Sequence, residues 1–263
     1  MNDHLIETKT TVMRETGSVA GIHFILQGKG GVGKSLAASI LGQYFQFRAV
    51  PCRSIDTDPV NQTLTQYKAL NARHLKLMID GQIDTRVFDG LVDEMMEASE
   101  SFVVDNGAST FIPLWHYIIE NRVVETLQNF GKNVYVHSVV TGGQALLDTL
   151  SGFDDVARTT PARNLVVWIN EFFGPVVHNG KTFKEMKVFA EHVDRLRGVV
   201  TIPRRSADTF GRDVEEMLRQ KITFDEAVAG KQFSIMSRQR LELIRRDLYA
   251  QLDELRFIEG EGE

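Results

Sequence analysis

A glycine-rich run, Gly28–Ser35, carries two lysines and ends in a serine. It matches the pattern G-x-x-x-x-G-K-[ST] in full. Glycines let a backbone curl closely enough to aim several N–H groups at one anion, and a following helix adds the positive charge of its amino end. The run therefore predicts a loop for nucleotide phosphates, with Lys34 on the β- and γ-phosphates and the Ser35 hydroxyl on magnesium. The expected contacts are Gly28, Lys29, Gly30, Gly31, Val32, Gly33, Lys34 and Ser35.

Carboxylates follow two further apolar runs. Asp56 and Asp58 stand in a D-T-D-P segment directly after one run, and Asp105 follows another. Carboxylates beside bound phosphates can hold a magnesium ion, directly or through its waters, and can orient an attacking water. We expect Asp105 to contribute a carboxylate to the magnesium shell, with the aspartate pair facing the phosphates from a second strand end.

Short apolar runs alternate with segments of helical spacing along the chain. The expected strands are Ile22–Gln27, Arg53–Ile55, Phe102–Val104, Val134–Val140, Leu165–Ile169 and Val199–Ile202, and the expected helices are Leu36–Phe47 and residues 143–157, 208–219 and 235–256. This alternation predicts an α/β fold, a mostly parallel, doubly wound sheet with helices on both faces. Ligands bind at the carboxyl ends of such strands. An irregular insert, Glu171–Gly180, is expected to turn as a hairpin at Asn179-Gly180.

Length and composition limit the classes of protein. We assign residues 19–258 to a single domain, residues 1–18 to a flexible extension and residues 259–263 to an acidic tail, because 263 residues suit one large domain. The only cysteine, Cys52, excludes an intrachain disulfide and fits a cytoplasmic protein. No apolar run reaches the roughly 18–20 residues that span a bilayer, so stable membrane insertion is not expected. A net charge of −5 gives no general reason to expect nucleic-acid binding.

Lys29 gives the glycine run the form K-G-G-x-G-K-[ST], which resembles the deviant Walker A motif of the ParA/MinD ATPases. The resemblance implies a P-loop NTPase fold, ATP/ADP and Mg2+ as ligands, and a homodimer that forms around ATP. It also implies that Lys29 reaches across the dimer interface to the partner's nucleotide. The D-T-D-P segment resembles the family's D-x-D-P motif, which assigns Asp56 to the magnesium neighbourhood and Asp58 to the attacking water. Catalysis would then depend on Lys29, Lys34 and Asp58.

Two further positions follow from the same resemblance. Asn170 ends an expected strand where related proteins place an asparagine whose amide reads the adenine edge, and an amide suits the adjacent donor and acceptor of adenine. Pro203 resembles the proline of an Ile-Pro segment that lines the base. The chain departs from the family after Asp105, where Asp105-Asn106-Gly107-Ala108-Ser109 replaces the usual D-x-P/A-x-G. This departure concerns the switch and the rate of hydrolysis rather than ATP binding.

A narrower resemblance rests on short strings around these motifs. The stretch from Leu26 to Ser35, together with Ile55–Asn61 and Tyr67–Asn71, is similar to the TraL family of plasmid conjugal-transfer proteins, which are small ParA-like ATPases. It extends over roughly residues 20–260. The resemblance implies a slow, partner-stimulated ATPase that positions or recruits an unidentified protein of the conjugation or partition machinery.

Alternative functions stay open at this point. One is an ATP-dependent metabolic amidoligase or synthetase on the same fold, although Cys52 stands just before a core strand, where a glutaminase nucleophile is poorly placed. The other is a weakly hydrolysing, nucleotide-dependent interaction module, which the unusual sequence after Asp105 would suit.

Two surface features have ordinary interpretations. Apolar residues at helical spacing near the C-terminus predict packing on the sheet or on a second subunit rather than on a membrane, because acidic residues share that helix. They are Leu241, Ile244, Leu248, Leu252 and Leu255. A basic group, Arg204, Arg205 and Arg212, supports DNA binding only weakly, and we favour a solvated surface.

Overall fold

The computed structural model of the chain describes residues 20–79 and 82–258. The extension expected at residues 1–18 and the acidic tail expected at residues 259–263 lie outside the described residues. No helix in the described part of the chain combines the length and the apolar character that crossing a membrane requires.

Each apolar run that the sequence marked as a strand is a strand of one seven-stranded sheet. The strands are β1 (Gly21–Ile25), β2 (Cys52–Asp56), β3 (Arg73–His74), β6 (Ser101–Asp105), β7 (Asn133–Thr141), β8 (Leu165–Asn170) and β11 (Leu196–Ile202). Their order is β11-β8-β7-β1-β6-β2-β3, and every pairing is parallel. The α/β prediction is thus confirmed. The short edge strand β3 was not predicted, because two residues show no periodicity.

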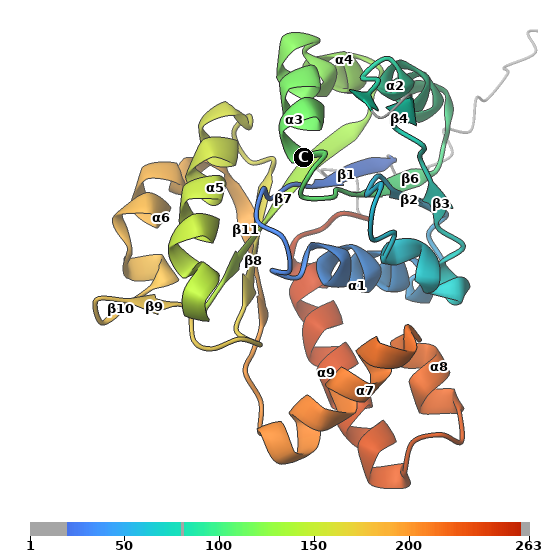
Figure 1. Cartoon of the computed structure of the whole chain (residues 1–263), viewed down its shortest axis with the longest axis vertical. Coiled ribbons are helices and arrows are strands. Elements are labelled where there is room, and N and C mark those ends of the chain that lie inside the picture. Colours follow the sequence, from blue (N-terminus) through green and yellow to red (C-terminus); the bar gives the residue numbers. More distant parts are fainter. Residues whose placement is uncertain (1–19, 80–81, 259–263) are drawn as a thin grey trace, which may run out of the picture.

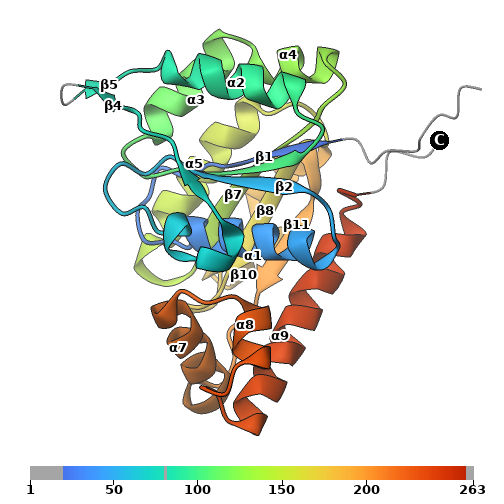
Figure 2. The same ribbon diagram turned by 90° about the vertical axis from the view of Figure 1, so that its right-hand side faces the viewer.

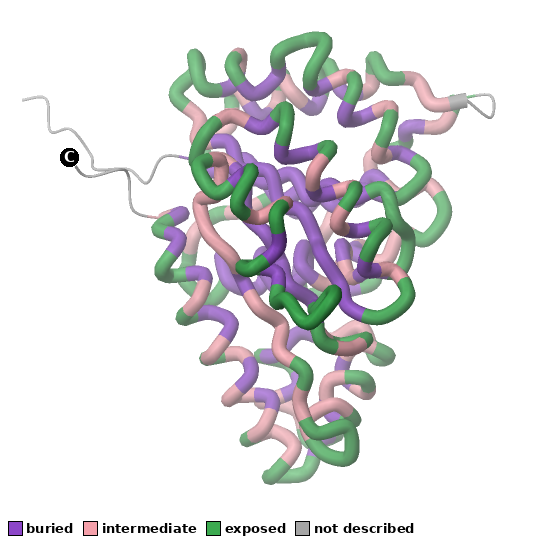
Figure 3. Tube along the Cα trace, turned by 90° about the vertical axis from the view of Figure 1, so that its left-hand side faces the viewer, coloured by how far each residue is buried: buried purple, intermediate pink, exposed green. Residues whose placement is uncertain are grey.

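Helices cover both faces of the sheet (Figure 1). They are α1 (Lys34–Phe47), α2 (Val87–Glu97), α3 (Phe111–Glu120), α4 (Val123–Asn129), α5 (Leu146–Thr159), α6 (Lys187–His192), α7 (Arg212–Gln220), α8 (Phe224–Ala229) and α9 (Ile235–Glu254). One apolar core lies between the sheet and α2 to α6. A second lies between the sheet, α1 and α9, and it continues to α7 and α8, which lie beside α9 on the far side of α1 (Figure 2). Burying both faces is why the central strands are continuous apolar runs, as the buried tube through the middle of Figure 3 shows.

The C-terminal apolar stripe packs against the body of the domain, on the sheet and α1, which is one of the two predicted positions. Its residues are buried along α9 and, for Leu255, just after the helix ends; α9 lies against α1 and β11. Helix α8 was missed because it spans only Phe224–Ala229, although Thr223 and Glu226 form a capping box in front of it. The helix expected at residues 208–219 begins as a π-turn, Ala207–Gly211, before α7.

Two hairpins project from the sheet. The predicted turn at Asn179-Gly180 is confirmed, since both residues have positive φ and join β9 (Val177–His178) to β10 (Lys181–Thr182). A second hairpin, β4 (Met78–Ile79) with β5 (Gln82–Ile83), was not predicted. The helix expected at residues 143–157 opens with a 3-10 turn, Gly143–Ala145, and continues as α5.

Candidate functional site

The glycine run connects the carboxyl end of β1 to the amino end of α1, at the centre of the sheet between β6 and β7. Gly31 and Gly33 adopt φ of +74° and +105°, a region that favours glycine. A Cβ atom at Gly33 would lie 2.5 Å from the amide nitrogen of Asn170. Glycine is therefore required there both for backbone conformation and for space.

Lys34 is buried in this loop. Its side chain is 7% exposed, and its Nζ donates to the carbonyl oxygen of Lys29 at 2.9 Å. Burial lowers the pKa of Lys34, while the charges of Asp105 and Asp58 act in the opposite direction. A poorly hydrated ammonium beside an open cavity has much to gain from an anionic ligand.

Asp105 is the most perturbed carboxyl group of the site. Burial raises its pKa to about 7, a hydrogen bond with the Ser35 side chain opposes that rise, and the charge of Asp56 adds to it. Its Oδ1 is buried and has no hydrogen-bond partner among the described residues. An orphaned carboxylate oxygen beside a serine hydroxyl is a donor set that suits Mg2+, a hard cation that prefers oxygen ligands.

The described residues include no cluster of three histidine, cysteine, aspartate or glutamate side chains that could hold a metal unaided. Mg2+ typically uses one or two carboxylates, completes its shell with water and phosphate oxygens, and so needs no such cluster. Ser35 and Asp105 could serve as protein ligands of this kind.

Asp56 lies opposite Asp105 in the register of β2 and β6. Its Oδ1 accepts from the N–H of Asp58 at 3.0 Å, and its Oδ2 accepts from the N–H groups of Leu64 and Thr65 at 2.9 and 3.3 Å. Burial raises its pKa and these bonds oppose the rise. Asp56 thus braces the turn that carries Asp58, and its role near magnesium stays a prediction.

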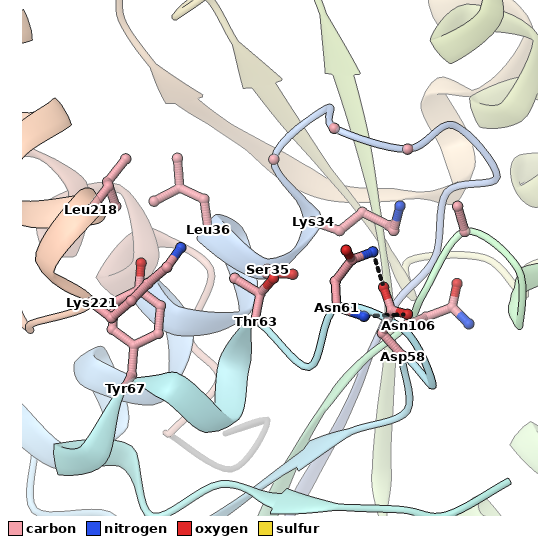
Figure 4. Close-up of a pocket in the computed structure, with 14 residues that line it drawn as sticks. Lys34, Ser35, Leu36, Asp58, Asn61, Thr63, Tyr67, Asn106, Leu218 and Lys221 are labelled. Carbon is pink, nitrogen blue, oxygen red and sulfur yellow. Dashed lines mark hydrogen bonds between the residues drawn. The ribbon is translucent and has the colours of Figure 1, made fainter.

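Asp58 points into the cavity beside Asn61 (Figure 4). Its Oδ1 accepts from the N–H groups of Val60 and Asn61, and its Oδ2 accepts from the Asn61 amide at 3.2 Å. Burial alone would raise the pKa of Asp58, but these bonds and the charge of Lys34 outweigh it and lower the pKa. The carboxylate is therefore ionised at neutral pH.

A cavity of about 410 Å³ lies beside the glycine loop, and the buried Asp56 and Asp105 are not among the residues that line it. Lys34, Ser35 and Asp58 line it at one end, and Tyr67 and Lys221 line it at the other (Figure 4). The Lys221 ammonium lies 5.8 Å from the centre of the Tyr67 ring. The sequence did not reveal Tyr67 or Lys221 as site residues, because neither stands at the end of a central strand.

A second, mostly apolar cavity of about 160 Å³ lies on the other side of Leu36, which lines both. Phe172, Pro203 and Phe210 are among its lining residues. The predicted base-lining position Pro203 therefore faces a hollow of suitable chemistry next to the phosphate loop.

Asn170 is not among the residues that line either cavity. Its side chain is buried, its Nδ2 donates to the carbonyl oxygen of Val32 at 2.9 Å, and its Oδ1 accepts from the N–H of Phe172 at 3.1 Å. Its adenine-reading role stays a prediction.

Lys29 points away from the cavity. Its side chain is 47% exposed, and its Nζ lies 2.6 Å from a carboxylate oxygen of Asp148, in the first turn of α5. Sequence reasoning missed Asp148, since nothing local marks it.

The segment after Asp105 packs on the phosphate loop. The Asn106 amide and the Thr110 hydroxyl are 2.9 Å apart, and that hydroxyl donates to the carbonyl of Gly107. A Cβ atom on Gly107 would lie 2.7 Å from Cγ of Asp58. Gly107 therefore permits a close approach of this segment to the Asp58 turn.

Comparisons with known proteins agree with this geometry. The sequence matches no protein-family model. Among solved structures, the MinD cell division protein of Aquifex aeolicus superposes with a TM-score of 0.51 at 16% identity, covering 88% of this chain and 97% of that one. MinD in the MinC:MinD complex of the same organism gives 0.51 at 14% identity, covering 88% and 96%. The chain thus shares the fold of these MinD cell division proteins.

Two relatives found by sequence are more similar to the chain than these structures are. Two Escherichia coli proteins named TraL are each 48% identical to this chain over 236 residues, which cover 89% of the chain and 98% of each relative. Identity at this level over nearly the whole length of both proteins implies a common family, so the chain belongs to the TraL family.

Proposed function

We propose that the chain is an ATP-binding and ATP-hydrolysing switch of the ParA/MinD type, in which two subunits close around Mg-ATP. The observation that supports this best is that Lys34, Ser35 and Asp58 line one cavity at the glycine loop, while the buried carboxyl group of Asp105 is hydrogen-bonded to the Ser35 side chain. A buried carboxylate oxygen without a donor is costly, and a divalent cation between Asp105 and the phosphates would satisfy it.

Each residue of the site then has its own role in binding the nucleotide or in hydrolysis. The loop N–H groups and Lys34 bind the β- and γ-phosphates, and Ser35 and Asp105 hold the metal. Magnesium, when bound, neutralises charge on the phosphate oxygens. Asp58 is ionised and lines the cavity, so it can accept a hydrogen bond from the attacking water and orient it. Asp56 would act behind the metal through a bound water.

The base would occupy the apolar cavity behind Leu36. A nucleotide whose phosphates lie on Gly28–Ser35 can extend past Leu36 to Phe172 and Pro203, which line that cavity. Aromatic and apolar side chains of this kind suit the faces of an adenine ring.

Dimerisation would employ Lys29. In the single subunit Lys29 pairs with Asp148, and because both side chains are about half exposed, such a pair contributes only about 0–1 kcal/mol. Lys29 can therefore leave Asp148 for a phosphate on a facing subunit at little cost. There it would stabilise developing negative charge as an arginine finger does.

The cellular role that fits is the positioning or recruitment of a protein of plasmid transfer or partition, in the cytoplasm. Similarity to proteins named TraL supports this role. Turnover would be slow until a partner binds, because the segment after Asp105 is fastened by Asn106 and Thr110.

The same hydrogen bonds, which hold the segment after Asp105, favour a second candidate function. This is an interaction module that binds ATP and a partner protein but hydrolyses ATP very slowly. A glutamine-dependent amidoligase has less support, because burial, with the nearby Glu100 charge, raises the pKa of the Cys52 thiol to about 12. A thiol of that kind is a poor nucleophile at neutral pH.

One experiment tests the proposal and separates these candidates. The full chain is titrated calorimetrically with Mg-ATP, and light scattering and phosphate release are then followed with ATP, ADP and a non-hydrolysable ATP analogue. We expect ATP binding, a dimer with the analogue but not with ADP, and measurable phosphate release. A chain that binds no ATP refutes the proposal, and a chain that binds ATP and stays monomeric refutes the switch.

A further inference from the structure

Each end of the Asn170 amide makes a hydrogen bond to the backbone. Its Nδ2 donates to the Val32 carbonyl inside the phosphate loop, and its Oδ1 accepts from the N–H of Phe172. The approach to the loop is so close that only a glycine fits at position 33. The remaining N–H and lone pair of this amide belong to a side chain that is 1% exposed and lines neither cavity, so the amide does not reach a base in either cavity unless it moves.

This contact closes a chain of hydrogen bonds through four buried side chains, Gln27, Thr149, Thr141 and Asn170, which we call the loop ring. Gln27 Nε2 donates to the carbonyl of Thr149 at 3.1 Å, and its Oε1 accepts from the N–H of Lys29 at 3.5 Å. The Thr149 hydroxyl accepts from the N–H of Thr141 at 3.2 Å. The Thr141 hydroxyl donates to the carbonyl of Asn170 at 2.9 Å, and Asn170 returns to Val32.

The ring therefore begins at one side of the phosphate loop and ends at the other, by way of α5, β7 and β8. A loop that binds phosphate must present its N–H groups inward and turn its carbonyl oxygens away. Asn170 holds the Val32 carbonyl, just as the Lys34 ammonium holds that of Lys29. Buried hydrogen bonds of this type are costly to break, because each leaves an unsatisfied polar group.

We propose that Asn170 and Gln27 are positioning residues, which hold the loop in its phosphate-binding shape, and that Asn170 does not select the base. This proposal rests on the proposed function, since it assumes that the loop binds phosphates. It predicts that both side chains affect every ligand carrying a polyphosphate, whatever its base.

A ligand without a base separates positioning from base reading. Magnesium tripolyphosphate, Mg-ATP and Mg-GTP are titrated calorimetrically into wild type, Asn170→Leu and Gln27→Met, which keep similar side-chain volume but lose the hydrogen bonds. We expect both variants to bind all three ligands about tenfold more weakly or worse, with the ratio of ATP to GTP affinity unchanged. A base reader would leave tripolyphosphate binding unchanged and lose only the preference for ATP.

Matched variants control for stability. Gln43 is a buried glutamine on α1 whose Oε1 accepts from the N–H of Phe224 at 2.8 Å, outside the ring, so Gln43→Met should lower the melting temperature without weakening tripolyphosphate binding. Thr141→Val removes the hydroxyl that contacts Asn170, whereas Thr141→Ser keeps it. We expect weaker tripolyphosphate binding in Thr141→Val and near-wild-type binding in Thr141→Ser, which keeps the test valid if Asn170→Leu fails to fold.

The outcomes are distinguishable. A wild type that binds neither ATP nor tripolyphosphate overturns the proposed function together with the ring. Normal wild-type binding, with tripolyphosphate affinity unchanged in Asn170→Leu or in the Thr141 pair, overturns the ring alone.

Discussion

The two lysines of the phosphate loop lie in contrasting surroundings. Lys34 is buried, bonds a carbonyl of its own loop and faces a cavity with Ser35 and Asp58. Lys29 is half exposed and forms an ion pair with Asp148, at the start of α5. The buried group is built to hold a ligand without moving, whereas the exposed one can change partners, and this is what a nucleotide-dependent switch requires of its two parts.

Loss of Lys34 should have the largest effect. Lys34→Ala removes the main positive charge proposed to contact the β- and γ-phosphates, so we expect no detectable Mg-ATP binding. Folding should change little, because among the described residues the ammonium donates to a single loop carbonyl. Calorimetric titration and a thermal melt measure the two quantities. Wild-type affinity in this variant would show that the ligand lies elsewhere.

Loss of Lys29 should spare binding and abolish assembly. Lys29→Ala is expected to bind Mg-ATP, yet to lose dimerisation with the non-hydrolysable analogue and most hydrolysis, a rate effect of about 10³–10⁵ if the lysine acts as a finger. Light scattering and phosphate release check this. Asp148→Ala is the matched control, since it removes the ion pair but leaves Lys29, and it should dimerise and hydrolyse. If Lys29→Ala dimerises and hydrolyses ATP like the wild type, then Lys29 has no separate role in assembly and the proposed difference between the two lysines is wrong.

A substitution of Asp58 tests whether the cavity that contains Lys34 also carries the residue needed for hydrolysis. Asp58→Ala should keep Mg-ATP binding and lose hydrolysis by about 10²–10⁴, the usual contribution of a group that orients or deprotonates a water. Phosphate release at saturating ATP gives the number. Turnover at the wild-type rate would move the base to another residue, such as one from the facing subunit.

The smallest expected effect is on pH dependence. Because burial raises the pKa of Asp105 to about 7, the protonated form dominates below that pH, and a protonated carboxyl is a poor magnesium ligand. Magnesium-dependent nucleotide affinity should then fall by up to about tenfold for each pH unit below 7. Asp105→Asn should bind more weakly and lose this slope. Titrations of both proteins between pH 5 and 8 test it, and a flat wild-type profile would contradict it.

The same raised pKa has a consequence for folding without ligand. A carboxyl group whose pKa is higher in the folded than in the unfolded chain destabilises the fold once it ionises, so Asp105 lowers stability as pH rises from about 4 to 7. Bound metal would offset this loss. Under the proposed function, the free chain would thus lose some stability at neutral pH through the same carboxylate that is proposed to bind the cation.

Much of the fold and the phosphate loop could be predicted from sequence, because local physics determines them. Burial on both faces makes the central strands apolar runs, a phosphate cradle needs glycines at positions such as Gly31 and Gly33, and a two-residue hairpin turn favours Asn179-Gly180. The apolar stripe of α9 likewise has its cause in helical geometry. Sequence alone therefore determined the fold class, and it predicted the phosphate loop and the charged residues proposed to bind a nucleotide there.

Tertiary structure alone decided which distant groups meet. Asn170 and Val32 are separated by 138 positions, and Gln27 reaches Thr149 across 122. The order β11-β8-β7-β1-β6-β2-β3 brings such groups together, and no local periodicity encodes that order. Asp148 beside Lys29 and Lys221 above Tyr67 depend on it in the same way. Residue type and spacing can thus indicate that Asn170 serves the site, but its hydrogen bonds, and hence its task, follow only from the packing of the strands around it.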